Sequence, residues 1–196
     1  MKETAAIVRF LTQVRATPNL LTLTRLFILP FLVIEILDAN YPGAFALFVL
    51  AGVTDALDGL MARWLHQKTK LGQYLDPIAD KLLLSTLFMV FTHTGLIPRY
   101  VTVLVFSRDL GILLISTLLF ATNTLRDFRP SYLGKLNTLV QILGVVSVLL
   151  NQLWSAAWLN MLTGGLLKVI AVLAPVSAAE YAWIVLRRIN SDPASA

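Results

Sequence analysis

Four aspartates stand in two closely spaced pairs in the first half of the chain. Asp55 and Asp58 are three residues apart, and Asp76 and Asp80 are four apart. Each spacing places both side chains on the same face of an α-helix. The short segment 64–71 between the pairs is expected to turn the chain, so that a helical hairpin brings the pairs face to face. The sequence therefore predicts one site built from four carboxylates.

Such a site is suited to divalent metal ions. Four carboxylates that face one another repel, and hard cations such as Mg²⁺ relieve that repulsion because they prefer carboxylate oxygen. The alternative is that each aspartate pairs with Arg63, Lys81 or another basic residue. One arginine and one lysine cannot neutralise four acids, which favours metal over ion pairs.

Small residues accompany the aspartates. Gly59 and Ala62 lie on the helical face of Asp58, and Gly72 lies one turn before the second pair. They leave room for a bulky ligand to approach the backbone, and Arg63 is suited to bidentate contact with phosphate. The alternative interpretation is that the small residues serve helix packing.

Six long apolar segments must position these residues. Of the 196 residues, 57% are hydrophobic and 14% are charged, which is more apolar side chain than a soluble domain of this length could bury. The apolar runs approach the roughly 20 residues that a helix needs to cross a bilayer. The sequence predicts an all-α integral membrane protein with six transmembrane helices at residues 20–38, 44–65, 73–93, 99–122, 135–155 and 160–186.

The segment before the first span differs from the spans. Residues 1–17 place apolar side chains mostly on one helical face, with Lys2, Arg9 and Arg15 interspersed. This pattern predicts an N-terminal amphipathic helix in the membrane interface, with a frayed terminus as the alternative. We expect residues 1–196 to form a single membrane domain, with the six-helix core at 18–188 and a tail at 189–196.

Lysine and arginine collect on one side of the predicted membrane. Arg99 is the only basic residue in the loops of the other side. This asymmetry predicts that both termini and the four aspartates face the cytoplasm. The net charge of +5 is explained by anionic lipid, so no nucleic-acid partner is expected. The absence of cysteine excludes disulfides and thiol chemistry.

The aspartates also belong to a known signature. The sequence TDALDGLMARWLHQKTKLGQYLDPIADK, whose first aspartate is Asp55, matches D-x2-D-G-x2-A-R-x8-G-x3-D-x3-D at every fixed position. On this motif the chain resembles the CDP-alcohol phosphotransferase (CDP-alcohol phosphatidyltransferase) family, whose six-helix architecture agrees with the six predicted spans. The resemblance implies transfer of a phosphatidyl group from CDP-diacylglycerol to a hydroxyl, with release of CMP.

The resemblance also implies roles for the site residues. Asp55, Asp58 and Asp76 would bind divalent metal and the pyrophosphate, while Asp80 would complete the metal site and act as general base. Two ions are expected, either Mg²⁺ or Mn²⁺, in a homodimer in the bacterial cytoplasmic membrane or the mitochondrial inner membrane. CDP-diacylglycerol would be bound by Asp55, Asp58, Gly59, Ala62, Arg63 and Gly72.

Later segments bear on the acceptor alcohol. Residues 18–25 (PNLLTLTR) and 75–82 (LDPIADKL) resemble the branch of the family that makes phosphatidylglycerophosphate and cardiolipin. The Arg108-Asp109 pair and the Lys-x-Asn-Thr-x-x-Gln run from Lys135 resemble the cardiolipin synthases of mitochondria and some bacteria. The acceptor expected on this resemblance is phosphatidylglycerol, with glycerol 3-phosphate as the alternative.

The acceptor preference has a physical interpretation. Glycerol 3-phosphate is a dianion that needs several cations, whereas phosphatidylglycerol carries one diester charge that Arg108 and Lys135 could bind. Asn137 supplies no charge, although its amide could instead join two helices. Asp109 is expected to point away from Arg108 on the helix, which leaves a phosphate diester as the partner for the arginine.

Other classes of protein also place acids in a membrane. A transporter or a non-catalytic scaffold is the remote alternative. Transporters of this size often contain repeated or broken helices, and the sequence contains no internal repeat.

Overall fold

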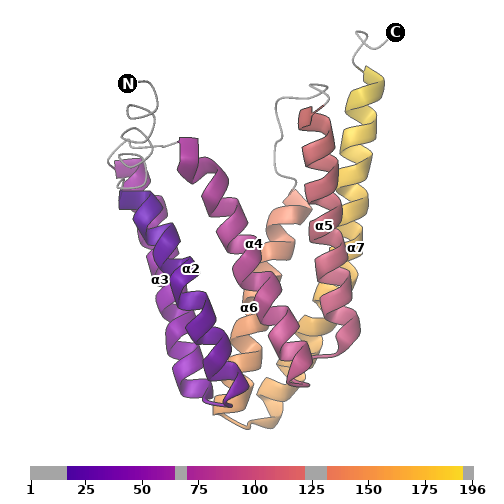
Figure 1. Cartoon of the computed structure of the whole chain (residues 1–196). Coiled ribbons are helices and arrows are strands. Elements are labelled where there is room, and N and C mark those ends of the chain that lie inside the picture. The colour runs from indigo at the N-terminus through magenta and orange to yellow at the C-terminus, as the bar shows by residue number, and fades with distance from the viewer. Residues whose placement is uncertain (1–16, 65–69, 122–131, 192–196) are drawn as a thin grey trace. The chain divides into compact units, whose positions relative to one another are not determined.

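The computed structural model describes residues 17–64, 70–121 and 132–191 (Figure 1). Side chains are described within these ranges except at 17–22, 58–64, 70–78, 80, 116–121 and 188–191. All regular structure in the described residues is helical. The helices are α2 (Thr17–Leu37), α3 (Tyr41–Trp64), α4 (Lys70–His93), α5 (Arg99–Ala121), α6 (Tyr132–Leu153) and α7 (Ala157–Ser191).

The helix bounds agree with the predicted apolar segments to within a few residues. The largest difference is the end of α7, which continues to Ser191 instead of ending at residue 186. Neither glycine nor proline occurs between these positions, and the next proline is Pro193, so no residue there stops the helix. The predicted amphipathic helix at 1–17 lies almost wholly outside the described residues.

The chain divides into two compact units, Met1–Val90 and Phe91–Ala196. In the first unit, α2 and α3 lie side by side as an antiparallel hairpin (Figure 1). Each helix contributes one buried stripe with the spacing of three to four residues that a helical face requires. The stripe of α2 contains Ile28, Leu32 and Ile36, and that of α3 contains Ala44, Phe48 and Ala51.

The turn between α2 and α3 is tightly hydrogen-bonded. Ala39 has a φ of 56°, and the N–H of Asn40 donates to the carbonyl of Glu35 over 2.8 Å. This is the helix ending in which one left-handed residue lets the chain bond back to the last turn. The Asn40 amide also donates to the Glu35 carboxylate, and the Asn40 carbonyl accepts from Ala44. One asparagine therefore ends α2 and begins α3.

In the second unit, α7 packs against both α5 and α6. Gly144 of α6 lies so close to α7 that an added Cβ would stand 2.6 Å from Cδ1 of Ile170. The Thr163 hydroxyl lies 3.2 Å from the Ser147 carbonyl of α6 and 2.9 Å from the Leu159 carbonyl of its own helix. A small residue and a hydroxyl thus contribute to the α6–α7 contact, as is common where helices pack in lipid.

Large apolar side chains are exposed on every described helix. Two helices, Tyr132–Leu153 and Ala157–Arg187, are long and apolar enough over their described residues to cross a membrane. The apolar parts described in α3 and α4 are shorter, at Tyr41–Leu57 and Lys81–His93. Examples of exposed side chains, from α2 to α7 in order, are Phe27, Val49, Met89, Val103, Leu139 and Val172.

The turn after α4 repeats the geometry of the α2 ending with a different residue. Gly95 has a φ of 76°, and the N–H of Leu96 donates to the Phe91 carbonyl over 2.8 Å. Glycine adopts this conformation without the steric penalty that a Cβ brings. We expect Ala39→Gly to raise the free energy of unfolding by about 0.5–1 kcal/mol, measured by denaturant titration in detergent.

The reverse substitution is the matched control. A Cβ at Gly95 would meet no atom within 4 Å, so Gly95→Ala changes only the backbone preference. It should lower the free energy of unfolding by a similar amount. Equal stabilities for Ala39→Gly and the unmodified protein would mean that Ala39 is not strained.

Candidate active site

The first aspartate of the motif is held by an arginine from the preceding helix. The Arg25 guanidinium on α2 donates from Nη2 to Oδ1 of Asp55 on α3. The Arg25 side chain is 3% exposed, whereas that of Asp55 is 52% exposed. A buried guanidinium requires a partner, and Asp55 supplies one although its own side chain is half exposed.

The packing of the hairpin explains this pair. Arg25 continues the buried stripe of α2 one turn before Ile28, and the exposed Asp55 lies one turn after Ala51, the last apolar residue of the α3 stripe. The two residues lie at nearly equal distances along the chain from the turn at Asn40. Closing the hairpin therefore brings them together, so the same packing that buries the apolar stripes places the ion pair.

This pair corrects the charge count made from the sequence. That count weighed Arg63 and Lys81 against four acids and omitted Arg25, whose place in an apolar segment was the signal for a partner. For Asp55 the alternative of pairing with another base is confirmed. The pair is compatible with the predicted role of Asp55 as a metal ligand, because Arg25 donates to Oδ1 and the Asp55 side chain is half exposed.

The other three aspartates lie on the expected helices. Asp58 is in α3, one turn beyond Asp55, and Asp76 and Asp80 are in α4. Their side chains are outside the description, as are those of Gly59, Ala62, Arg63 and Gly72. Among the side chains described, no group of three His, Asp or Glu is close enough to hold a metal ion. The predicted meeting of the two pairs therefore stays a prediction.

The donor chemistry of the motif fits a hard divalent cation. The Asp55 carboxylate is half exposed, and the residues that the motif adds are carboxylates of the same type. Carboxylate oxygens suit Mg²⁺ and Mn²⁺. If the metal site forms as predicted, Asp55 would contribute Oδ2 to it while Arg25 keeps Oδ1.

The prediction that Asp109 points away from Arg108 is wrong. On α5 the Arg108 guanidinium donates from Nη1 to Oδ1 of Asp109, and Nε donates to the Ser177 hydroxyl on α7 over 3.2 Å. A long arginine side chain can bend back to its neighbour, which an argument from helical angles overlooks. Both charged residues are 9% exposed, so a phosphate is not needed to balance Arg108.

The remaining acceptor candidates lie on different sides of α6. Lys135 is exposed, whereas Asn137 is fully buried. Both amide atoms of Asn137 lack a hydrogen-bond partner among the described residues, and so does Nε2 of Gln141 one turn later. A buried amide without partners is unfavourable, so this face of α6 has hydrogen-bonding capacity that a ligand could use.

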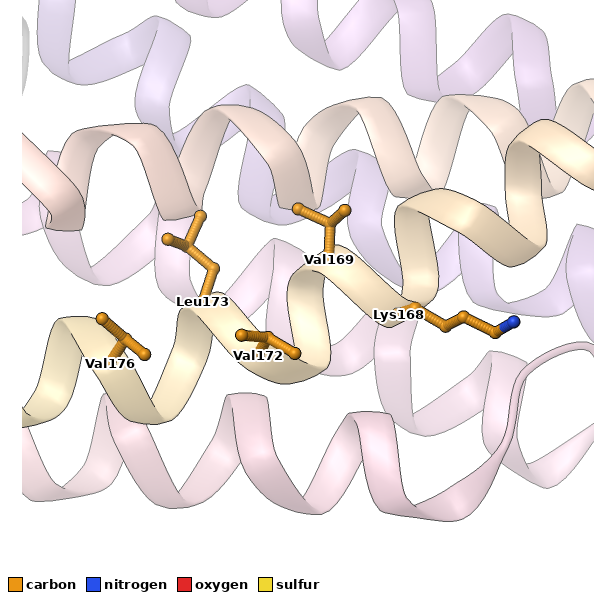
Figure 2. A pocket seen from close by; sticks show the side chains of 5 residues that line it. All are labelled: Lys168, Val169, Val172, Leu173 and Val176. Carbon is orange, nitrogen blue, oxygen red and sulfur yellow. The ribbon is translucent and has the colours of Figure 1, made fainter.

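A hollow of about 410 Å³ lies elsewhere, against α7 (Figure 2). Its described lining consists of four apolar side chains and Lys168, all from α7, and includes none of the predicted site residues. Figure 2 shows Lys168 at one end of the row of apolar side chains. The lining residues are Lys168, Val169, Val172, Leu173 and Val176.

The comparison with protein families bears on the motif directly. A model of the CDP-alcohol phosphatidyltransferase family matches residues 15–177, which include all four aspartates, Arg25 and the acceptor candidates. The chain belongs to the CDP-alcohol phosphatidyltransferase family. The resemblance inferred from the motif is therefore confirmed.

Curated members of this family are similar over most of the chain. The rat (Rattus norvegicus) cardiolipin synthase (CMP-forming) is 36% identical over 158 residues, which cover 71% of this chain and 52% of the rat protein. The CDP-diacylglycerol–glycerol-3-phosphate 3-phosphatidyltransferase of Aquifex aeolicus is 34% identical over 166 residues, which cover 84% of this chain and 92% of the Aquifex protein. A putative cardiolipin synthase of Mycobacterium tuberculosis is 37% identical over 148 residues, which cover 73% of this chain and 70% of the mycobacterial protein. The matches span about half the length of the animal cardiolipin synthases.

In this member of the CDP-alcohol phosphatidyltransferase family, removing one partner of the buried Arg108–Asp109 pair should be far more destabilising than removing both, because one partner alone leaves an uncompensated charge. We expect Asp109→Leu to lower the free energy of unfolding by about 3–5 kcal/mol, because Arg108 would keep its charge without a carboxylate. The double variant Arg108→Met with Asp109→Leu should recover most of that loss. Thermal unfolding in detergent measures both.

Ser177→Ala is the control for this prediction. It removes one neutral partner of Arg108 and should lower the stability by only about 1 kcal/mol. If Asp109→Leu were no more destabilising than Ser177→Ala, Arg108 would not depend on Asp109 to compensate its buried charge.

Proposed function

We propose that this protein is an integral membrane enzyme that transfers a phosphatidyl group from CDP-diacylglycerol to a glycerol-type hydroxyl and releases CMP. The observation that carries the proposal is the complete eight-residue motif on α3 and α4, within the region that the family model matches. The proposed acceptor is phosphatidylglycerol, which would give cardiolipin. Glycerol 3-phosphate, which would give phosphatidylglycerophosphate, is the second candidate.

The chemistry requires one bond to form and one to break. The acceptor oxygen attacks the phosphatidyl phosphorus, the bond from that phosphorus to the CMP oxygen breaks, and Asp80 accepts the hydroxyl proton. Asp55, Asp58 and Asp76, with Asp80 completing the site, would hold two divalent ions, Mg²⁺ or Mn²⁺, whose charge would balance that of the pyrophosphate and the leaving CMP. CDP-diacylglycerol would also contact Gly59, Ala62, Arg63 and Gly72.

A membrane setting is supported by the exposed side chains. All six described helices expose large apolar residues, which a soluble surface of this extent would not tolerate. We propose that α2 to α7 are six membrane spans and that residues 1–17 lie at the interface. The lysine and arginine asymmetry supports an active site on the cytoplasmic side. We also propose that the protein is a homodimer in a bacterial cytoplasmic membrane or a mitochondrial inner membrane.

Two observations favour phosphatidylglycerol as the acceptor. The rat and human relatives are named as CMP-forming cardiolipin synthases, and the buried Asn137 offers an uncharged amide where a dianion would need a cation. The second candidate is favoured by the Aquifex relative, of which the match covers 92%. Arg108 and Lys135 stay proposed acceptor contacts, although Arg108 already has two protein partners.

Loss of activity at the four aspartates should come from their place in the site and not from the loss of one negative charge anywhere in the protein. We expect Asp58→Asn and Asp76→Asn each to abolish Mg²⁺-dependent release of labelled CMP from CDP-diacylglycerol, because each removes a metal ligand. Asp80→Asn should retain binding of CDP-diacylglycerol and lose turnover. Asp38→Asn is the control, since Asp38 is exposed at the opposite end of the α2–α3 hairpin. Near-normal turnover of Asp58→Asn or Asp76→Asn would refute the proposed metal site.

The acceptor is tested by offering phosphatidylglycerol and glycerol 3-phosphate side by side to the purified enzyme. Phosphatidylglycerol should be the better substrate. Asn137→Leu should fold at least as stably as the unmodified protein, because it removes a buried amide without partners. The Michaelis constant for phosphatidylglycerol should nevertheless rise about tenfold with the loss of a charge-assisted hydrogen bond.

Asn151→Leu, near the other end of α6, is the matched control and should leave the Michaelis constant for phosphatidylglycerol unchanged. Preference for glycerol 3-phosphate by the unmodified enzyme would establish the second candidate. A marked loss of stability in Asn137→Leu would instead assign the amide to helix packing.

A further inference from the structure

We propose that Arg25 is the counter-ion of the metal site: it neutralises Asp55 while the site is empty and thereby limits how tightly the metal is held. The inference rests on the proposed function, because it takes Asp55 as a metal ligand. It adds a positioning residue that lies outside the motif and on a different helix from the aspartates.

The geometry divides the Asp55 carboxylate between two roles. Nη2 of Arg25 donates to Oδ1, and the Asp55 side chain is 52% exposed. Arg25 is 3% exposed and lies in line with the apolar stripe of α2, and this burial should limit how far the guanidinium can move when a cation arrives. The pair therefore presents Asp55 through its second oxygen, Oδ2, in both the empty and the loaded site.

The electrostatics then determine the direction of the effect. Carboxylates gathered at one site repel one another when no cation is present, and the Arg25 charge relieves part of that repulsion. When a divalent cation binds, the same guanidinium charge opposes it. Arg25 should therefore stabilise the metal-free enzyme and weaken its affinity for metal. A purely structural arginine would stabilise the hairpin without changing the metal affinity.

The experiment measures Mn²⁺ binding to the purified enzyme in detergent by electron paramagnetic resonance. Arg25→Gln and Arg25→Met remove the charge, and methionine retains an apolar side chain that fits the stripe. For both variants we expect the Mn²⁺ dissociation constant to fall about fivefold. Because Asp55 is half exposed, the difference from the unmodified enzyme should shrink as KCl is raised.

Stability provides a second readout. In EDTA both neutral variants should unfold at a lower temperature than the unmodified enzyme. Saturating Mn²⁺ should raise their unfolding temperature by more than it raises that of the unmodified enzyme, because tighter binding stabilises the folded state further. If a neutral variant could be purified in folded form only when Mn²⁺ is present, that result would support the proposal for the same reason.

Two controls separate charge from shape and from position. Arg25→Lys keeps the charge and should leave the Mn²⁺ dissociation constant close to that of the unmodified enzyme. Arg99→Gln removes an exposed arginine at the start of α5 and should also leave it unchanged.

The outcomes distinguish the inference from the proposed function. If the unmodified enzyme binds Mn²⁺ but the neutral variants bind it equally or more weakly, the counter-ion role is wrong and the metal site stands. If the neutral variants fail to fold even with Mn²⁺, Arg25 serves the hairpin alone and the inference is overturned. If the unmodified enzyme binds no Mn²⁺, the metal site and the inference fail together.

Discussion

A charge inside an apolar helix must find a partner, and this constraint organises both units of the protein. Arg25 is paired with Asp55 across the α2–α3 hairpin, and Arg108 is paired with Asp109 and Ser177 between α5 and α7. Where helices pack in lipid, apolar contact alone gives little preference for one neighbour over another. Specific polar contacts of this kind therefore help to fix which helices meet and at what register.

The two pairs use the constraint differently. Arg108 and Asp109 are both buried and neighbours in sequence, so the pair is closed and satisfied within the protein. Arg25 is buried but Asp55 is half exposed, so the charge is balanced while a carboxylate oxygen stays accessible. The first arrangement suits a structural element, and the second suits a ligand that is already oriented before a cation reaches it.

Much of this arrangement could be predicted from the sequence because it depends on local patterns. The apolar runs placed α2 to α7 within a few residues of their bounds, and the motif from Asp55 to Asp80 identified the family. The partner of Arg25 was missed because it depends on how α2 and α3 align in the hairpin. Neither buried stripe alone specifies that alignment, and both must be considered at once. The Arg108–Asp109 pair was missed because a flexible side chain does not follow the helical angle of its own Cα. The side chains of Asp58, Asp76 and Asp80 lie outside the described residues, so their meeting still rests on the motif.

Arg25 and Asp55 both lie within the α2–α3 hairpin, which has a consequence for how the protein folds during its synthesis. The α2–α3 hairpin contains all the residues of this ion pair and of both buried stripes, so it needs nothing downstream to close. Local hairpins of this kind form before distant contacts are available. We expect the Arg25–Asp55 pair to be formed while α4 is still being synthesised. Because the chain has no cysteine, Ile28→Cys with Ala51→Cys would report this closure. A cross-link that forms in ribosome-bound chains lacking α4 would establish it, and a cross-link that requires α4 would refute it.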